Sequence, residues 1–306
     1  MVTGPIDTSD RVVYAALMTS IPAERRRAMA AGLGAIALWG ALATLSVLAG
    51  PIPPFQMVAM TFAIGALIGI VRARRRGLAW LDLLRWPAPV WLLGVGGLFG
   101  YHALYFAALQ LAPPAEANLV NYLWPLLIVL LSAPLAGERL GWPHLVGALL
   151  GFAGVAVLAV GRGVSFTGTY ALGYLLALGC AFAWSLYSVL SRRFGETPTD
   201  AIASFCAAAA ILSLGCHWLF EPTVWPATPV AWLAVLALGV GPTGGAFYLW
   251  DHAVKRGDIR ALGALSYAAP ILSTALLVAC GLAPPTLTLL LAAVLVTVGA
   301  VLASFL

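Results

Sequence analysis

Two short stretches decide the fold: Asn121–Pro125 (NYLWP) and Ser266–Pro270 (SYAAP), which lie 145 residues apart inside long apolar segments. Outward from them, the same ungapped spacing relates residues 28–157 to residues 173–302. The coinciding residues are mostly rare or conformationally special ones: Trp39 and Trp184, Pro53 and Pro198, Gly94 and Gly239, Gly96 and Gly241, Gly100 and Gly245, Tyr122 and Tyr267, Pro125 and Pro270, and Gly154 and Gly299. The chain is therefore predicted to contain one structural unit twice.

The composition is that of a membrane protein. Hydrophobic residues make up 62% of the chain and charged residues only 9%, whereas a soluble domain carries about 25% charged residues. A helix that crosses the hydrocarbon core needs roughly 20 apolar residues. The sequence predicts an all-α integral membrane protein with ten transmembrane helices, at about 28–49, 54–71, 88–111, 115–135, 142–160, 168–190, 199–219, 229–251, 259–280 and 286–306.

Five predicted spans fall in each copy of the repeated unit. Because five is odd, the second copy enters the membrane from the opposite side, and the pair forms an inverted repeat. We predict a cytoplasmic tail over residues 1–24, a first five-helix repeat over 25–162 and a second, inverted repeat over 163–306. This plan is chiefly that of a carrier, and a single bundle of this size is expected to work as a monomer.

The basic residues are distributed unevenly among the predicted loops. Of the 16 lysines and arginines, 15 fall on one side of the membrane and only Arg162 falls on the other. The positive-inside rule then places both termini in the cytoplasm. No basic stripe interleaves with aromatics on a soluble face, so no nucleic-acid partner is expected. Residues 1–24 lack a long apolar core and a cleavage site, and are expected to form a loose tail and not a signal peptide.

No pattern typical of an enzyme or a metal protein is present in the sequence. The four cysteines lie within or at the ends of predicted spans and none is in a CxxC pair, so neither a disulfide nor a zinc site is expected. There is also no nucleophile–base pair and no glycine-rich phosphate loop. We therefore expect no catalysis, no metal and no cofactor, and as partners only the lipid bilayer and a small-molecule substrate.

Two prolines interrupt equivalent predicted spans. Pro125 and Pro270 each remove a backbone N–H and are expected to free the carbonyl four residues earlier, at Asn121 and Ser266. A freed carbonyl is costly in lipid, so it should face protein, water or a substrate. Carriers built from inverted repeats bind substrate near the midplane, where helices are interrupted.

Polar aromatic residues and small polar residues gather at mid-span positions near these prolines. Their hydroxyl, amide and N–H groups need partners in the membrane, so they are expected to face inward and to line a cavity. The alternative is an aromatic-filled core with no ligand. The candidate substrate-binding residues are Trp39, Tyr101, His102, Tyr105, Asn118, Asn121, Tyr122, Trp184, Tyr187, Ser188, Tyr248, Ser266 and Tyr267.

Charged residues are missing from the middle of every predicted span. A phosphate binder should supply a buried cation, and a cation or drug exporter usually keeps a membrane carboxylate. Glu116 and Asp251 lie only at span ends. The substrate is therefore expected to be neutral or zwitterionic, without strong ion coupling. His102 could titrate at mid-depth, and a hydrogen-bonded neutral histidine is favoured over a proton carrier.

Glycines four residues apart occur at equivalent places in the third and eighth spans. Small residues at this spacing let helices approach closely. Gly96, Gly100, Gly241 and Gly245 are therefore interpreted as close helix contacts and, together with Pro125 and Pro270, as hinge or packing positions.

The stretch Ala107–Leu158 resembles a recurrent pattern of the drug/metabolite transporter superfamily, in its EamA branch: AALQLAPPAEANLVNYLWPLLIVLLSAPLAGERLGWPHLVGALLGFAGVAVL. The resemblance extends over about 28–306. The second copy departs from it at Gly281–Pro284, which lacks the Gly-Glu of Gly137 and Glu138, so Glu138 is interpreted as a helix-end residue.

The aromatic residues resemble those of the family's aromatic amino acid exporters. This resemblance implies a carrier of the bacterial inner membrane that exports aromatic and other neutral amino acids. It also implies that Tyr122 and Trp124 line the cavity opposite Trp184. Helical geometry supports Tyr122 directly, whereas Trp124 should point elsewhere unless the Pro125 kink turns it inward.

The sequence thus favours an exporter of small neutral amino acids or related metabolites that works by alternating access. Two alternatives remain: an exporter of hydrophobic toxicants, and a lipid-handling membrane protein that transports no solute.

Overall fold

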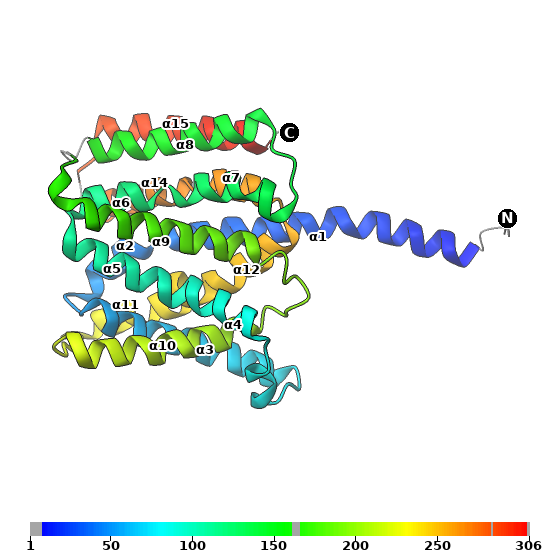
Figure 1. Cartoon of the computed structure of the whole chain (residues 1–306), viewed down its shortest axis with the longest axis horizontal. Helices are drawn as coiled ribbons and strands as arrows, with labels where there is room; N and C mark the ends of the chain where they lie inside the picture. The colour runs from blue at the N-terminus through cyan, green and yellow to red at the C-terminus, as the bar shows by residue number, and fades with distance from the viewer. Residues whose placement is uncertain (1–7, 161–165, 283, 305–306) are drawn as a thin grey trace.

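The computed structural model describes residues 8–160, 166–282 and 284–304 (Figure 1), and every regular element in these ranges is helical. The first half of the chain contains α1 (Thr8–Gly40), α2 (Leu42–Ala49), α3 (Pro54–Arg75), η1 (Trp80–Leu84), α4 (Ala88–Val95), η2 (Gly96–Gly100), α5 (Tyr101–Leu111), α6 (Pro114–Asn121), α7 (Trp124–Ala136) and α8 (Trp142–Val160). The second half contains η3 (Gly168–Tyr170), α9 (Ala171–Leu190), α10 (Ala201–Phe220), α11 (Pro229–Val240), η4 (Gly241–Gly245), α12 (Ala246–Arg256), α13 (Ile259–Leu265), α14 (Ala268–Ala279) and α15 (Leu287–Ser304).

Nine segments of the described residues are long and apolar enough to cross a bilayer. They agree with the first nine predicted spans to within a few residues at most ends, because the apolar length of a segment is what the membrane selects. The predicted tenth span is a shorter apolar helix in the described residues, α15. The protein is a multi-pass, all-helical membrane protein. The helix α1 begins at Thr8, so the later part of the tail predicted as loose is helical and, in Figure 1, stands outside the bundle.

Apart from a one-residue break at Ala41 between α1 and α2, the interruptions of the membrane spans come in two pairs. A single π-helical turn separates α4 from α5 at η2 and α11 from α12 at η4, two places 145 residues apart. In η4 the cause is local, since Pro242 has no N–H to donate within an α-helix. Single π turns inside α-helices are frequent at functional sites.

The second pair of interruptions lies where α6 gives way to α7 and α13 to α14. Tyr122 is the C-cap residue of α6, and Ser266 is the C-cap residue of α13. The carbonyl of Ser266 accepts a hydrogen bond from the Ala269 amide at 3.0 Å. The expectation that Pro270 frees this carbonyl is therefore wrong, because the chain tightens into a shorter turn that supplies another donor.

Only some of the glycines predicted as close helix contacts have a neighbour: a Cβ built on Gly241 would lie 3.4 Å from Leu38 Cδ2 of α1. A Cβ built on Gly96 or Gly100 would meet nothing within 4 Å, so the interpretation of these two as close contacts is wrong. A spacing of four does not ensure that a neighbour lies opposite. At Gly97, in contrast, a Cβ would lie 2.5 Å from the Tyr187 Cβ, and at Gly65 it would lie 3.0 Å from the Gly244 Cα. These contacts hold η2 against α9 and α3 against η4.

Pairs of helices form two opposite edges of the bundle around a central group of helices (Figure 1). Along one edge α8 packs on α15, and a Cβ at Gly147 would lie 2.9 Å from the Ala303 Cβ. Toward the opposite edge α3 packs on α10. The central helices include α1, which packs on α12, and α9, which packs on α5 and α7. These five helices, together with α6, carry the candidate site.

Candidate substrate-binding site

Four tryptophans from four different helices meet at the centre of the bundle: Trp39 of α1, Trp124 of α7, Trp184 of α9 and Trp250 of α12. We call them the indole cluster. Trp39 lies 5.1 Å from Trp250, 5.7 Å from Trp184 and 6.1 Å from Trp124 between ring centroids. The Trp124 ring is perpendicular to that of Trp184 at 6.4 Å, an edge-to-face arrangement that aromatic rings prefer. Trp124, Trp184 and Trp250 are buried.

Two indole N–H groups of this cluster have identified acceptors. Trp39 Nε1 donates to the carbonyl of Pro242 at 3.1 Å, in the π turn η4. Trp250 Nε1 donates to Ser188 Oγ at 3.0 Å. A buried N–H without an acceptor is costly in the membrane, so these bonds fix the ring positions. Ser188, a predicted ligand, acts here as the acceptor for an indole.

Two tyrosine–asparagine pairs lie beside the indole cluster, between α5 and α6. Asn121 Nδ2 donates to the Tyr101 hydroxyl at 3.1 Å, and the Tyr105 hydroxyl donates to Asn118 Oδ1 at 2.5 Å. The two phenol rings are nearly parallel, with 6.1 Å between centroids. The Tyr101 ring lies 5.8 Å from that of Trp184. The structure thus brings together seven of the predicted ligands: Trp39, Tyr101, Tyr105, Asn118, Asn121, Trp124 and Trp184.

His102 is held by a backbone bond and by aromatic rings. Its Nδ1 is 2.7 Å from the Leu98 carbonyl, which can only accept, so Nδ1 carries a proton. The ring meets Phe62 edge-on at 5.2 Å and Tyr101 at 5.2 Å. This environment favours the hydrogen-bonded structural histidine over the proton carrier.

The remaining predicted ligands have other main partners, although Tyr122 still interacts electrostatically with Tyr101 and Tyr105, and the Tyr187 ring lies 5.2 Å from that of Trp184. Tyr122 packs with Leu119 and Val155 in a second hydrophobic cluster toward α8, because the chain turns directly after Asn121. Tyr267 is fully buried in the same cluster, and its ring lies 6.4 Å from that of Phe152. Their roles as ligands stay predictions.

Two others, Tyr248 and Tyr187, pack between helices, and Ser266 bonds within its own helix. The Tyr248 hydroxyl donates to the Gly65 carbonyl at 2.9 Å, which ties α12 to α3. Ser266 Oγ donates to its own helix at Leu262. Tyr187 is 1% exposed and packs against Gly97.

Four residues of the patch are absent from the predicted set. Trp250 completes the indole cluster, and Phe247 stacks on Phe62 at 5.4 Å and 12°. Cys180 lies 3.2 Å from Asn121 Oδ1. Phe247 and Trp250 are three residues apart on one helix, which places them on one face. That spacing was the available sequence indication for two of the four.

Charged residues are concentrated at one end of the bundle, which is the predicted cytoplasmic end. Arg192 forms an ion pair with Glu138 at 3.0 Å and donates to the Gly257 carbonyl at 2.9 Å. Asp258 caps α13 and pairs with Arg260 at 2.9 Å and with Arg25 at 2.7 Å. We call these five charged residues the end network. It joins the middle of α1, at Arg25, to the ends of α7, α9, α12 and α13.

The carboxyl of Asp258 shows how strongly this network favours its charged form. Burial alone would raise the pKa of Asp258. The hydrogen bonds from Arg260 and from the Ala261 amide, with the charges of Arg260 and Arg25, outweigh that effect and lower the pKa to about 2.

At the opposite end, two carboxylates also have defined partners. Glu221 accepts from the backbone amides of Phe55 and Gln56 at the start of α3, at 2.9 and 3.0 Å, and lies 3.0 Å from His217 Nδ1. Glu116, buried in the first turn of α6, accepts from the Tyr174 hydroxyl. Anions at helix N-termini are stabilising, so both fit roles in holding helix ends.

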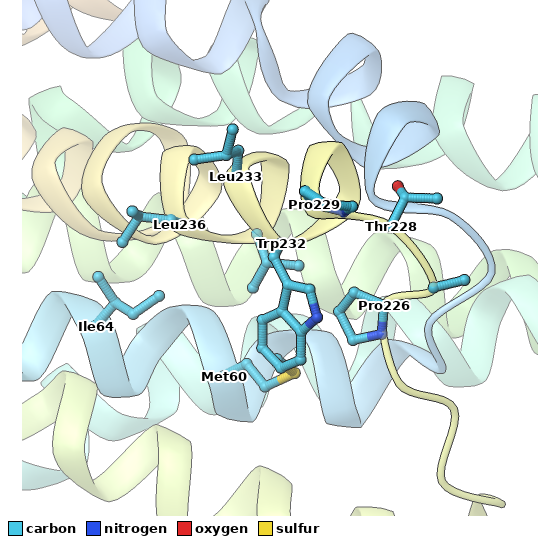
Figure 2. Close-up of a pocket in the computed structure, with 10 residues that line it drawn as sticks. Met60, Ile64, Pro226, Thr228, Pro229, Trp232, Leu233 and Leu236 are labelled. Carbon is cyan, nitrogen blue, oxygen red and sulfur yellow. The ribbon is translucent and has the colours of Figure 1, made fainter.

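An apolar groove of about 980 Å³ lies between α3 and α11 (Figure 2). Trp232 extends from α11 across it toward Met60, with Pro226 at its rim. Its ten lining residues include none of the predicted site residues. Trp232, Leu233 and Leu236 are exposed on this face, as expected for lipid contact. The groove is therefore not the site.

The described helices form a multi-pass bundle whose interrupted spans meet at a patch of indoles, phenols and amides. Interrupted membrane helices that converge on a polar site are the arrangement of a secondary transporter.

Comparisons with known proteins agree with this class. The model of the EamA-like transporter family matches residues 26–160 and again residues 171–305. The chain is 55% identical to the aromatic amino acid exporter YddG of Ancylobacter novellus, over 92% of this chain and 98% of that protein. It is 26% identical to the aromatic amino acid exporter YddG of Salmonella typhimurium, over 90% and 96%. A solved crystal structure superimposes with a TM-score of 0.87 at 54% identity, covering 92% of this chain and 97% of that one. The chain belongs to the EamA-like transporter family.

Proposed function

We propose that this transporter exports small neutral amino acids, aromatic ones above all, by alternating access and without obligatory ion coupling. The observation that carries the proposal is the junction of the indole cluster with the two tyrosine–asparagine pairs. Indoles stack on an aromatic side chain, while neutral hydroxyls and amides match a zwitterion whose net charge is zero. The 55% identical relative, an aromatic amino acid exporter by name, supports the same substrate class.

The architecture we propose is ten spans in two inverted repeats, over residues 25–162 and 163–306. Three observations support it. The paired π turns and the paired breaks at Tyr122 and Ser266 recur at a spacing near 145. One family model matches both halves. The basic residues favour a cytoplasmic location for both termini in a bacterial inner membrane. We further propose that the monomer is the working unit.

In this proposal the end network closes the cytoplasmic entrance. An exporter must load its substrate from the cytoplasm, so the Glu138–Arg192 pair must separate in each cycle. Arg192 is 24% exposed and Glu138 22%, so water reaches both partners. An ion pair that water can reach contributes little net stability. Separating Glu138 from Arg192 therefore costs little free energy.

Exchange assays in proteoliposomes test the substrate class. Vesicles holding the purified protein would be loaded with labelled phenylalanine, tryptophan, threonine or a sugar. We expect saturable exchange of the amino acids, fastest for the aromatic ones, and none of the sugar. Inhibition of phenylalanine exchange by a lipophilic cation, with the cation itself transported, would favour the hydrophobic-toxicant exporter instead. An absence of flux with any solute would favour lipid handling.

A further inference from the structure

The two phenols of the site have opposite hydrogen-bond polarity. The Tyr101 hydroxyl oxygen accepts from Asn121 Nδ2 at 3.1 Å, so its own proton remains available to a ligand. The Tyr105 hydroxyl donates its proton to Asn118 Oδ1 at 2.5 Å, so its oxygen can still accept a hydrogen bond from a ligand. Tyr101 is therefore a donor toward the site and Tyr105 an acceptor.

A third residue fixes the polarity at Tyr101. Cys180 Sγ lies 3.2 Å from Asn121 Oδ1 and 3.4 Å from the Tyr101 carbonyl. A thiol beside the amide oxygen directs the amide nitrogen toward the Tyr101 hydroxyl. Asn121 is 4% exposed and Cys180 fully buried, so water has little access to compete for these bonds.

Both phenols are placed to meet one ligand. They lie one turn apart on α5 with nearly parallel rings, and both are half-buried. Helix α5 carries no charged residue, and the only one on α6, Glu116, lies in its first turn with Tyr174. The charged ends of a substrate in this place must therefore be met by neutral dipoles.

We propose that Tyr101 and Tyr105 read the two ends of a zwitterion and fix its direction in the site. The Tyr101 hydroxyl donates to the α-carboxylate, and the Tyr105 oxygen accepts from the α-ammonium group. Asn121, Asn118 and Cys180 are positioning residues that set which phenol donates. The side chain of the substrate then points to the indole cluster, since Trp184 adjoins Tyr101. This inference rests on the proposed function, because it requires an amino acid in the site.

Selectivity between analogues tests the assignment of the two ends. Labelled phenylalanine exchange would be competed with phenylalaninamide, which lacks the carboxylate, and with 3-phenylpropionate, which lacks the ammonium group. Loss of one hydrogen bond to a charged group costs on the order of tenfold in affinity. Tyr101→Phe should therefore reduce the preference for phenylalanine over phenylalaninamide on the order of tenfold. It should leave the preference for phenylalanine over 3-phenylpropionate unchanged. Tyr105→Phe should reduce the preference for phenylalanine over 3-phenylpropionate and leave the preference over phenylalaninamide unchanged.

Tyr170→Phe is the matched control, since it removes one hydroxyl at the exposed start of α9. It should leave both preferences as they are. The assignment is overturned if each site variant alters both preferences equally or if neither variant alters any. If wild-type protein carries no phenylalanine at all, the proposed function fails first, and this inference with it.

The positioning role of Cys180 has its own test, which does not depend on the phenol variants folding. Cys180→Ser keeps a donor beside Asn121 Oδ1 and should keep the wild-type preference over phenylalaninamide. Cys180→Ala removes the donor and should lower that preference several-fold, with phenylalanine still transported. Equal selectivity in the serine and alanine variants would contradict the role of the thiol.

Discussion

At the residue scale, the site depends on how single polar atoms are satisfied. Two hydrogen bonds hold two rings of the indole cluster: Trp250 Nε1 donates to Ser188 Oγ, and Trp39 Nε1 donates to the Pro242 carbonyl. Asn118 and Asn121, three residues apart on α6, were predicted as ligands because they are polar residues at mid-span, and the structure gives each a tyrosine partner. Which ring meets which across helices was not predictable, since sequence spacing contains no distances between helices. Trp250 was missed for this reason.

Asp258 gives a prediction about pH at this scale. A folded-state pKa of about 2, below the usual value near 3.9, means that the Asp258 carboxylate stabilises the protein above about pH 4. This contribution is lost as the pH falls from about 4 to about 2. We expect Asp258→Asn to lower the melting temperature in detergent by a constant amount from pH 8 to pH 5. Below about pH 4 the difference from wild type should shrink. A difference that grows on acidification would refute this explanation.

Neighbouring glycines give a second prediction. A Cβ at Gly97 would lie 2.5 Å from the Tyr187 Cβ, where no flexible side-chain end can move away. Gly97→Ala should therefore destabilise the fold by roughly 1–3 kcal/mol, measured by thermal unfolding in detergent. Gly96→Ala is the matched control, because Gly96 has helical dihedral angles and open space around its Cβ direction. It should be neutral or slightly stabilising. Equal melting temperatures of the two variants would contradict the packing assigned to η2.

At the element scale, interrupted helices place the site. The interruptions of the fourth and ninth spans followed from Pro125 and Pro270 in the sequence, whereas the π turns of the third and eighth spans were not predicted. The third and eighth spans use π turns, and the fourth and ninth use short turns. The Tyr122 side chain turns into another cluster because the helix ends just before it. Helical periodicity predicts the direction of a side chain only as far as the helix continues, and α6 ends before Tyr122.

The fourth prediction concerns the element ends joined by Glu138 and Arg192. If the end network closes the cytoplasmic entrance, Glu138→Gln should raise the population of the state that is open on that side. The reporter is the buried thiol of Cys180, in a protein whose other three cysteines are serine. We expect several-fold faster labelling of Cys180 by a membrane-impermeant maleimide added from the cytoplasmic side. Glu196→Gln, in the same exposed loop region after α9, is the control and should label at the original rate.

Unchanged labelling in Glu138→Gln would assign the pair a static role at the helix end, which is the role its sequence context suggested. Faster labelling in both variants would indicate general loosening and not a gate.

At the scale of the whole molecule, composition and length determined most of what the sequence could predict. The apolar spans follow from the cost of unsatisfied backbone groups in lipid, so nine of them could be located to within a few residues at most ends. The family follows from motifs such as Ala107–Leu158 and is confirmed by the match to both halves. Packing contacts could not be predicted, since Gly96 and Gly97 are alike in sequence and opposite in surroundings.

The account as a whole is tested most directly by phenylalanine counterflow. Purified protein would be placed in liposomes that contain unlabelled phenylalanine, and uptake of the labelled amino acid would be followed with and without a proton gradient. The account predicts saturable counterflow at the same rate in both conditions, because the site meets a zwitterion with neutral dipoles. Counterflow that requires the gradient would contradict the uncoupled mechanism and return His102 and Glu116 to consideration as proton sites. No counterflow from protein that melts cooperatively would contradict the substrate itself.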